Sequence, residues 1–153
     1  MPVKPIPDGY HTVTPYLIVK GAAQALDFYK KAFGATELFR MPGPDGRVMH
    51  AEFRIGSSPI MIGDECPQMG ATAPQPGAKV PVTLHLYVEN VDAFVDRAVS
   101  AGATVVRPLA NQFYGDRSCG LACPFGHSWY VATHIEDVSM EEMQKRMAAM
   151  PKP

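Results

Sequence analysis

The sequence TPYLIVKGAAQALDFYKKAFGAT at residues 14–36 predicts a strand, a helix and the start of a second strand. Its first part, TPYLIV at 14–19, is a short run rich in β-forming residues. The helical part carries apolar residues at helical spacing, namely Ala22, Ala25, Leu26, Tyr29 and Phe33. Gly34 suits the left-handed turn that closes a helix, and Thr36 then begins a strand.

The same pattern occurs again in TLHLYVENVDAFVDRAVSAGAT at residues 83–104. TLHLYV has the length of TPYLIV, and both predicted helices end at Gly-Ala-Thr. The second helix has its own apolar face, made of Val91, Phe94, Val95, Ala98 and Val99. One such unit is too small to bury both its helix and its sheet, so we expect two copies to share a core.

A β-rich half follows each helix. The predicted strands are about 36–41, 48–55 and 59–63 in the first copy, and about 104–109, 118–122 and 128–134 in the second. These long β-only halves disfavour a ferredoxin-like fold, which begins with a similar β-α unit. The prediction is an α+β fold with two βαβββ modules, at about 11–64 and about 80–135, in a single domain of residues 1–153.

Two further segments complete this organisation. Residues 65–79 are rich in proline and glycine and are the predicted linker between the modules. Ser139 followed by Glu142 is a capping box, which predicts a C-terminal helix at about 139–149.

Composition excludes several classes of protein. A hydrophobic fraction of 46% and a charged fraction of 19% are typical of a globular chain, and Lys and Arg are too scattered for a nucleic-acid surface. No apolar run approaches the roughly 18 residues that span a membrane. The Pro-rich start lacks the apolar core of a signal peptide, so we expect a cytoplasmic location. The three cysteines, Cys66, Cys119 and Cys123, are expected to be reduced thiols.

Three stretches together resemble the PhnB-like proteins of the glyoxalase/bleomycin resistance (vicinal oxygen chelate) superfamily. Residues 14–35 resemble their opening, MPGPDGRVMHAEFRIGSSPIMIGDE at 41–65 their next hairpins, and residues 82–139 their second module. DFYKKAFGA and PFGHSWYVATH are the most specific parts. The resemblance implies that the two modules form an open, U-shaped mixed β-barrel around a cleft for a small molecule.

Strand parity predicts which side chains line this cleft, because side chains alternate between the two faces of a strand. On the strand 82–88, Leu84 and its aliphatic partners should pack under the helices, while Thr83, His85 and Tyr87 face the cleft. By the repeat Tyr16 lies there too, and Tyr130 belongs to the same aromatic face. On 48–55 the helix side is predicted to be Met49, Ala51, Phe53 and Ile55, with His50, Glu52 and Arg54 on the other side.

The charged and imidazole side chains on that face leave alternatives open. A buried charge needs a partner, so Glu52 and Arg54 are expected near the rim. His85 is the favoured cleft residue, because its neighbours on the strand are apolar and it shares the polar, aromatic face. For both His85 and His50 the alternative is a structural histidine, hydrogen-bonded across strands.

The resemblance implies a metal site, but the residues at its ligand positions are poor metal ligands. Metal-binding members place ligands on the first and last strands of each module. Those positions fall here on Thr14, Thr83 and Tyr130, with the fourth near Met61 or Asp64. Hydroxyl groups are poor ligands for a transition metal, so we expect no cofactor. A fallback site for a divalent metal is His50 and His85 with Glu52.

The segment 111–117, NQFYGDR, is predicted to be a turn beside the cleft mouth, as in the resembling proteins. Arg117 would bind an anionic group, Tyr114 would stack on a flat ligand, and Asp116 would orient Arg117 or His85. An ordinary surface turn with an Asp116–Arg117 pair is the alternative.

These observations favour a small-molecule binding protein without a metal, whose ligand is anionic or carries a carbonyl. The alternatives are a metal-dependent lyase, isomerase or dioxygenase resembling glyoxalase, and an accessory protein with a vestigial cleft. We also expect a homodimer with contacts at the linker 65–79 and the tail helix, because open sheets leave edges that need cover.

Overall fold

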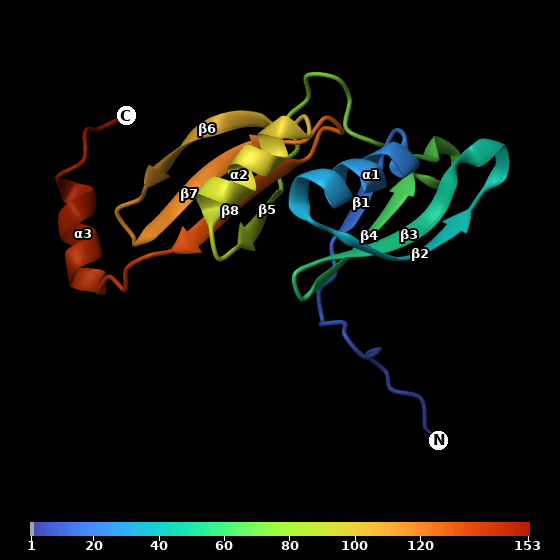
Figure 1. The fold of residues 1–153 in the computed structure, drawn as a ribbon, viewed down its shortest axis with the longest axis horizontal. Helices are drawn as coiled ribbons and strands as arrows, with labels where there is room; N and C mark the ends of the chain where they lie inside the picture. The colour runs from blue at the N-terminus through green and yellow to red at the C-terminus, as the bar shows by residue number, and fades with distance from the viewer. Residues whose placement is uncertain (1) are drawn as a thin grey trace.

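The computed structural model describes residues 2–153 and shows two modules with the same order of elements (Figure 1). The first module contains β1 (Tyr16–Val19), α1 (Ala22–Phe33), β2 (Thr36–Pro42), β3 (Val48–Ile55) and β4 (Ser58–Asp64). The second contains β5 (Thr83–Tyr87), α2 (Val91–Ser100), β6 (Thr104–Asn111), β7 (Asp116–Ala122) and β8 (Ser128–His134). The helix α3 (Met140–Ala148) follows. The predicted α+β fold with two βαβββ modules is confirmed.

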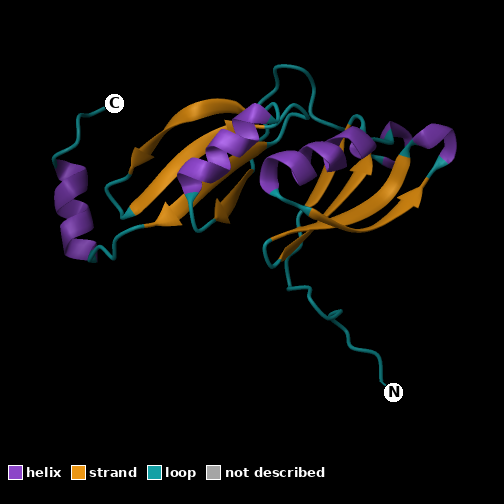
Figure 2. Ribbon diagram, in the orientation of Figure 1, coloured by secondary structure: helices purple, strands orange, loops and turns teal. Residues whose placement is uncertain are grey.

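Each module forms one mixed, four-stranded sheet with the same topology. The strand orders are β1-β4-β3-β2 and β5-β8-β7-β6, and in each sheet the first pair is parallel and the other pairs are antiparallel. The sheets lie side by side along the long axis, with α1 and α2 on the same side of them (Figures 1 and 2). They are not closed into a barrel. One face of each sheet is therefore covered by a helix, and the other face stays open.

The helices are anchored at their N-termini by side chains of the sheets. Asp64 on β4 accepts hydrogen bonds from Gly21 N at 2.8 Å and Ala22 N at 2.9 Å, at the start of α1. In the second module the hydroxyl of Thr133 on β8 accepts from Val91 N at 2.9 Å, at the start of α2. These bonds satisfy backbone donors that have no partner inside a helix. No helix of residues 2–153 is long and apolar enough to cross a membrane.

The two modules share one core, centred on Tyr29 of α1. The Tyr29 ring stacks on Phe53 of the first module with centroids 5.1 Å apart, and it lies 5.3 Å from Trp129 of the second module. Its hydroxyl lies 3.3 Å from the sulfur of Cys123. His127 Nε2, in the last turn of the second module, donates to the carbonyl of Ile18 on β1 at 3.1 Å. The contacts of Tyr29 and His127 thus join the two modules in one core.

The parity prediction is confirmed except at Val82, which is exposed before the start of β5, and where β3 is irregular. Leu84 and Leu86 pack against the core, and Ala51, Phe53 and Ile55 are buried. Met49, expected on the helix side, is exposed. The register shifts there, since Met41 pairs with His50 and the next residue, Pro42, pairs with Val48. This bulge turns Val48 into the core and Met49 outward.

The linker after the first module and the helix after the second largely agree with the predictions from the sequence. The linker forms no strand of its own and closes a small turn through an isolated bridge between Cys66 and Ala71. Ser139 caps α3 by accepting from Glu142 N at 3.2 Å. Arg146 then holds α3 to the preceding segment, with Nη2 2.8 Å from Glu136 Oε1 and Nη1 3.3 Å from the carbonyl of Phe113. α3 lies at the end of the molecule, beyond the second sheet (Figure 1).

Candidate functional site

One row of side chains crosses the open face of the second sheet. Arg107 on β6 pairs with Gly120 on β7, Gly120 pairs with Tyr130 on β8, and Tyr130 pairs with His85 on β5. The His85 and Tyr130 rings are stacked, with centroids 6.2 Å apart and an angle of 10° between their planes. Tyr87 extends the row at 4.8 Å from His85. The sheet register thus produces a continuous aromatic strip.

Gly120 allows Arg107 to reach this strip. A Cβ atom at Gly120 would lie 3.0 Å from Cβ and 3.3 Å from Cγ of Arg107, so the stem of the arginine occupies the space above the glycine. The guanidinium carbon of Arg107 lies 5.5 Å from the centre of the Tyr130 ring. That is within the range of a cation–π contact.

Three polar groups of this row lack a protein partner in the described part of the chain. The buried hydroxyl of Tyr130 makes no hydrogen bond. Neither the guanidinium of Arg107 nor the imidazole of His85 is hydrogen-bonded to any of residues 2–153. His85 also lines a cavity of about 150 Å³ at the junction of the modules, together with His11, Pro15 and Trp129. The guanidinium of Arg107 and the imidazole of His85 therefore have no protein partner that would compete with a ligand, whereas the Tyr130 hydroxyl is buried as well as unpaired.

A second group lies at the end of the strip, around the buried Asp116. Tyr87 Oη donates to Asp116 Oδ2 at 2.8 Å, and His134 Nδ1 lies 2.7 Å from Asp116 Oδ1. His134 Nε2 lies 2.8 Å from Asp137 Oδ1. The bonds to Asp137 and Asp116 raise the pKa of His134 above 6.5, and the bond to Asp116 raises the pKa of Tyr87 above 10.0. Asp116 therefore fixes Tyr87 and His134 rather than Arg117 or His85.

The open face of the first sheet carries a separate hydrogen-bonded chain. Tyr16 Oη lies 2.7 Å from His50 Nδ1, and His50 Nε2 lies 3.2 Å from Glu52 Oε2. Tyr10, in the segment before β1, donates its hydroxyl proton to Glu52. Glu52 is only 5% exposed, so the expectation that it lies near the rim is wrong. Its burial is tolerated because both Tyr10 and His50 are hydrogen-bonded to it.

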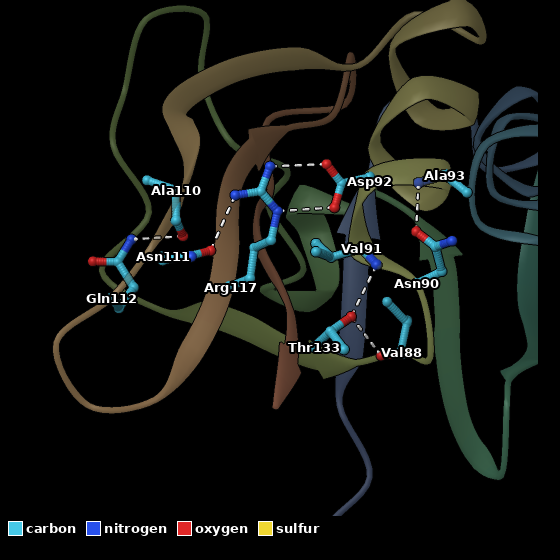
Figure 3. Close-up of polar contacts among 10 residues, drawn as sticks. All are labelled: Val88, Asn90, Val91, Asp92, Ala93, Ala110, Asn111, Gln112, Arg117 and Thr133. Carbon is cyan, nitrogen blue, oxygen red and sulfur yellow. Dashed lines mark hydrogen bonds and ion pairs between the residues drawn. The ribbon is translucent and has the colours of Figure 1, made fainter. Parts of the chain in front are cut away.

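Arg117 does not lie on the open face. The strand β7 begins at Asp116, two residues earlier than expected, and alternation then turns Arg117 toward α2 (Figure 3). Its Nε and Nη2 atoms each lie 2.9 Å from a carboxylate oxygen of Asp92, and its Nη1 lies 3.1 Å from Asn111 Oδ1. This bidentate pair lowers the pKa of Asp92. The predicted position of Arg117 beside the cleft is wrong, and Arg107 is the cation on that side.

Of the other predicted site residues, Tyr16, His50, His85, Tyr87, Asp116 and Tyr130 lie on the open faces. Tyr114 lies in the turn between β6 and β7, with its ring edge-on to Phe113 at 5.2 Å. Sequence reasoning missed Arg107, Tyr10 and His134. A signal existed for His134, whose spacing of two and four residues from Ala132 and Tyr130 gives all three the same parity.

The sequence matches the model of one protein family over residues 10–131, namely the glyoxalase/bleomycin resistance protein/dioxygenase superfamily. The chain belongs to this superfamily. An uncharacterised protein of Mycobacterium bovis is 46% identical to it over 140 residues, which cover 90% of this chain and 92% of that protein. The resemblance inferred from the sequence is confirmed.

Solved structures of the superfamily share the fold. A putative 3-demethylubiquinone-9 3-methyltransferase, the PhnB protein of Bacillus cereus, aligns with a TM-score of 0.62 at 17% identity, covering 80% of this chain and 99% of that one. The fosfomycin resistance protein FosX of Listeria monocytogenes, in complex with Mn(II) and sulfate, aligns with a TM-score of 0.61 at 18% identity, covering 90% and 97%. At these identities the likeness is one of fold.

Residues at the superfamily's ligand positions do not fit a transition metal here. The pairing of Tyr16 with Met61 and of His85 with Tyr130 makes Met61 the first-module counterpart of Tyr130. The four positions then hold Thr14, Thr83, Met61 and Tyr130, whose hydroxyl and thioether groups are weak donors for Zn²⁺, Fe²⁺ or Mn²⁺. The fallback set is not assembled either. Within residues 2–153, no three His, Cys, Asp or Glu side chains converge as a metal site, and His50 and Glu52 bond each other.

Proposed function

We propose that this protein binds a flat, anionic small molecule on the open face of its second sheet. The observation that carries the proposal is the row of Arg107, Tyr130 and His85, in which a guanidinium lies over an aromatic strip with its donors free among residues 2–153. An aromatic carboxylate matches this row in both shape and charge. The binding role of each of these residues is part of the proposal.

The chemistry of each side chain suggests how such a ligand would bind. A guanidinium presents planar, paired donors that suit a carboxylate or a phosphate. The parallel rings of Tyr130 and His85 offer a surface on which a flat molecule can stack. Tyr87 is fixed by its 2.8 Å bond to Asp116, so its ring adds to the strip without a loss of side-chain freedom on binding. Tyr114 lies beyond Tyr87 in the adjoining turn.

Binding without a metal is favoured over metal-dependent chemistry by the donor set. A lyase, isomerase or dioxygenase that resembles glyoxalase would need imidazole or carboxylate ligands where this chain has Thr14, Thr83, Met61 and Tyr130. Binding by Arg107, Tyr130 and His85 on the second sheet requires no metal ligands.

A thermal-shift comparison of benzoate with benzamide tests the proposal. The two molecules have the same shape, and only benzoate carries a charge at neutral pH. Because a ligand that binds the native state alone raises the melting temperature, benzoate should raise it and benzamide should not. A shift of equal size with both molecules would contradict the role given to charge. No shift with either would favour an accessory protein whose cleft is vestigial.

We further propose that the protein is a homodimer, with contacts at the linker 65–79 and α3. In support, α3 presents two exposed methionines, Met140 and Met147, the exposed Met150 follows the helix, and no helix or strand covers them in the described chain. Light scattering at micromolar concentration should give twice the 16.6 kDa mass of one chain. A mass near that of one chain would refute the dimer. A cytoplasmic location stays a prediction from the sequence.

A further inference from the structure

The first sheet holds a cavity of about 260 Å³ that the proposed carboxylate site does not use. It lies between β1, β3 and the turn at residues 66–71, and its walls are mostly apolar, formed by Ile18, Val48, Met49, Met69 and Ala71. Tyr16 lines the same cavity. Its hydroxyl lies over Gly63, where a Cβ atom would come within 3.2 Å of Tyr16 Oη. A phenolic oxygen is thus presented at the edge of an apolar pocket.

The hydrogen-bonded chain behind Tyr16 has one direction when Glu52 is ionised and His50 is neutral. An ionised carboxylate can only accept hydrogen bonds. The 3.2 Å contact between Glu52 Oε2 and His50 Nε2 therefore places the His50 proton on Nε2. In the neutral ring Nδ1 must then accept, and its partner at 2.7 Å is Tyr16 Oη, so the Tyr16 proton points at His50.

The Tyr16 hydroxyl consequently faces the cavity with lone pairs only. Burial and the charge of Glu52 raise the pKa of Tyr16 above 10.0, which keeps its proton in place for His50. The ionic groups around the cavity are already engaged. Asp64 caps α1, Glu65 accepts from Ala73 N at 3.1 Å, and Arg47 donates to the carbonyl of Glu65 at 3.4 Å. The acceptor lone pairs of Tyr16 are therefore a polar feature open to a ligand, beside the remaining N–H donors of Arg47 at the rim.

We propose that this cavity binds a small aromatic molecule that donates a hydroxyl hydrogen bond to Tyr16, such as a phenol or an enol. The chain from Glu52 through His50 sets this preference for a donor. A ligand whose only polar group is a carbonyl would place its lone pairs against those of Tyr16, and would bind less tightly. The assignment uses no residue of the Arg107 row, so a failure with benzoate leaves it standing.

Calorimetric titrations with phenol and acetophenone test this direction. Wild-type protein should prefer phenol by about threefold to tenfold, which corresponds to one neutral hydrogen bond. Tyr16→Phe removes the acceptor and should bring the preference close to one. A wild-type protein that binds both molecules equally, or a Tyr16→Phe variant that keeps the preference, would overturn the assignment.

Glu52→Gln is the decisive variant. The amide of glutamine can donate to His50 Nε2, which moves the ring proton to Nδ1 and frees the Tyr16 proton for the cavity. Acetophenone binding should then rise and the preference for phenol should shrink. Tyr10→Phe is the matched control, since it also removes one hydrogen bond of Glu52 but leaves the carboxylate as an acceptor. It should keep the wild-type preference. If both variants change the preference equally, the effect is one of packing and the proposal fails.

Discussion

Replacing Tyr29 by alanine should destabilise both modules at once. Tyr29 is fully buried on α1, yet its ring contacts Phe53 of the first module and Trp129 of the second. Removing a buried aromatic side chain costs ~3–5 kcal/mol, because a cavity remains. In a chain of about 150 residues that corresponds to a fall in melting temperature of roughly 6–20 °C. Because the free energy of unfolding of a domain is only about 5–15 kcal/mol, this loss would remove a large fraction of it.

Two optical signals distinguish shared from separate unfolding. Trp129 is the only tryptophan, so its fluorescence reports the second module, whereas far-UV circular dichroism reports the whole chain. Both urea midpoints should shift together in Tyr29→Ala. Tyr29→Phe, which removes only the 3.3 Å contact with Cys123, should cost about 0.5–1.5 kcal/mol and serves if the alanine variant fails to fold. An unchanged fluorescence midpoint in both variants would refute a single cooperative domain.

Three further predictions concern single side chains. Gly120→Ala should weaken benzoate binding by about tenfold and also lower the melting temperature, because the new Cβ meets Cβ and the backbone nitrogen of Arg107 at 3.0 and 3.3 Å and shifts β6 there; calorimetry measures the binding. His134 has a raised pKa, so its charged bonds with Asp137 stabilise the fold fully below pH 6.5 and are lost as the pH rises through the raised value. The melting temperatures of wild-type and His134→Gln should therefore differ most at about pH 5.5–6 and converge at higher pH. Arg146→Ala should speed proteolysis of α3 but leave the melting temperature unchanged, since α3 forms no part of the core.

The repeat in the sequence predicts the fold because each copy has to bury one helix on one sheet. The predicted bounds of β3 and β8 agree with the structure, and parity places His85 and Tyr130 on the open face. Arg117 shows where this reasoning stops. The sequence NQFYGDR does not show where the turn ends and the strand begins. β7 begins two residues earlier than predicted, so Arg117 lies within the strand and faces α2.

Contacts between distant segments explain the other misses. β6 contains two register shifts on either side of Arg107, so alternation along 104–111 does not show where that side chain points. Glu52 is expected near the rim because a buried charge needs a partner, and its partner Tyr10 lies in a Pro-rich segment without periodicity, far from His50 and Glu52 in the sequence. Such contacts follow from the folded chain and have no local signal.

The most direct test of the proposed function compares two arginines by calorimetric titration with benzoate. Arg107 lies over Tyr130 on the open face, and Arg117 is paired with Asp92 on the helix side. Arg107→Ala should weaken binding by about tenfold to a hundredfold, the loss of one charge-assisted hydrogen bond, and Arg117→Ala should bind as the wild type does. Loss of binding in Arg117→Ala with full binding in Arg107→Ala would contradict the site described on the second sheet.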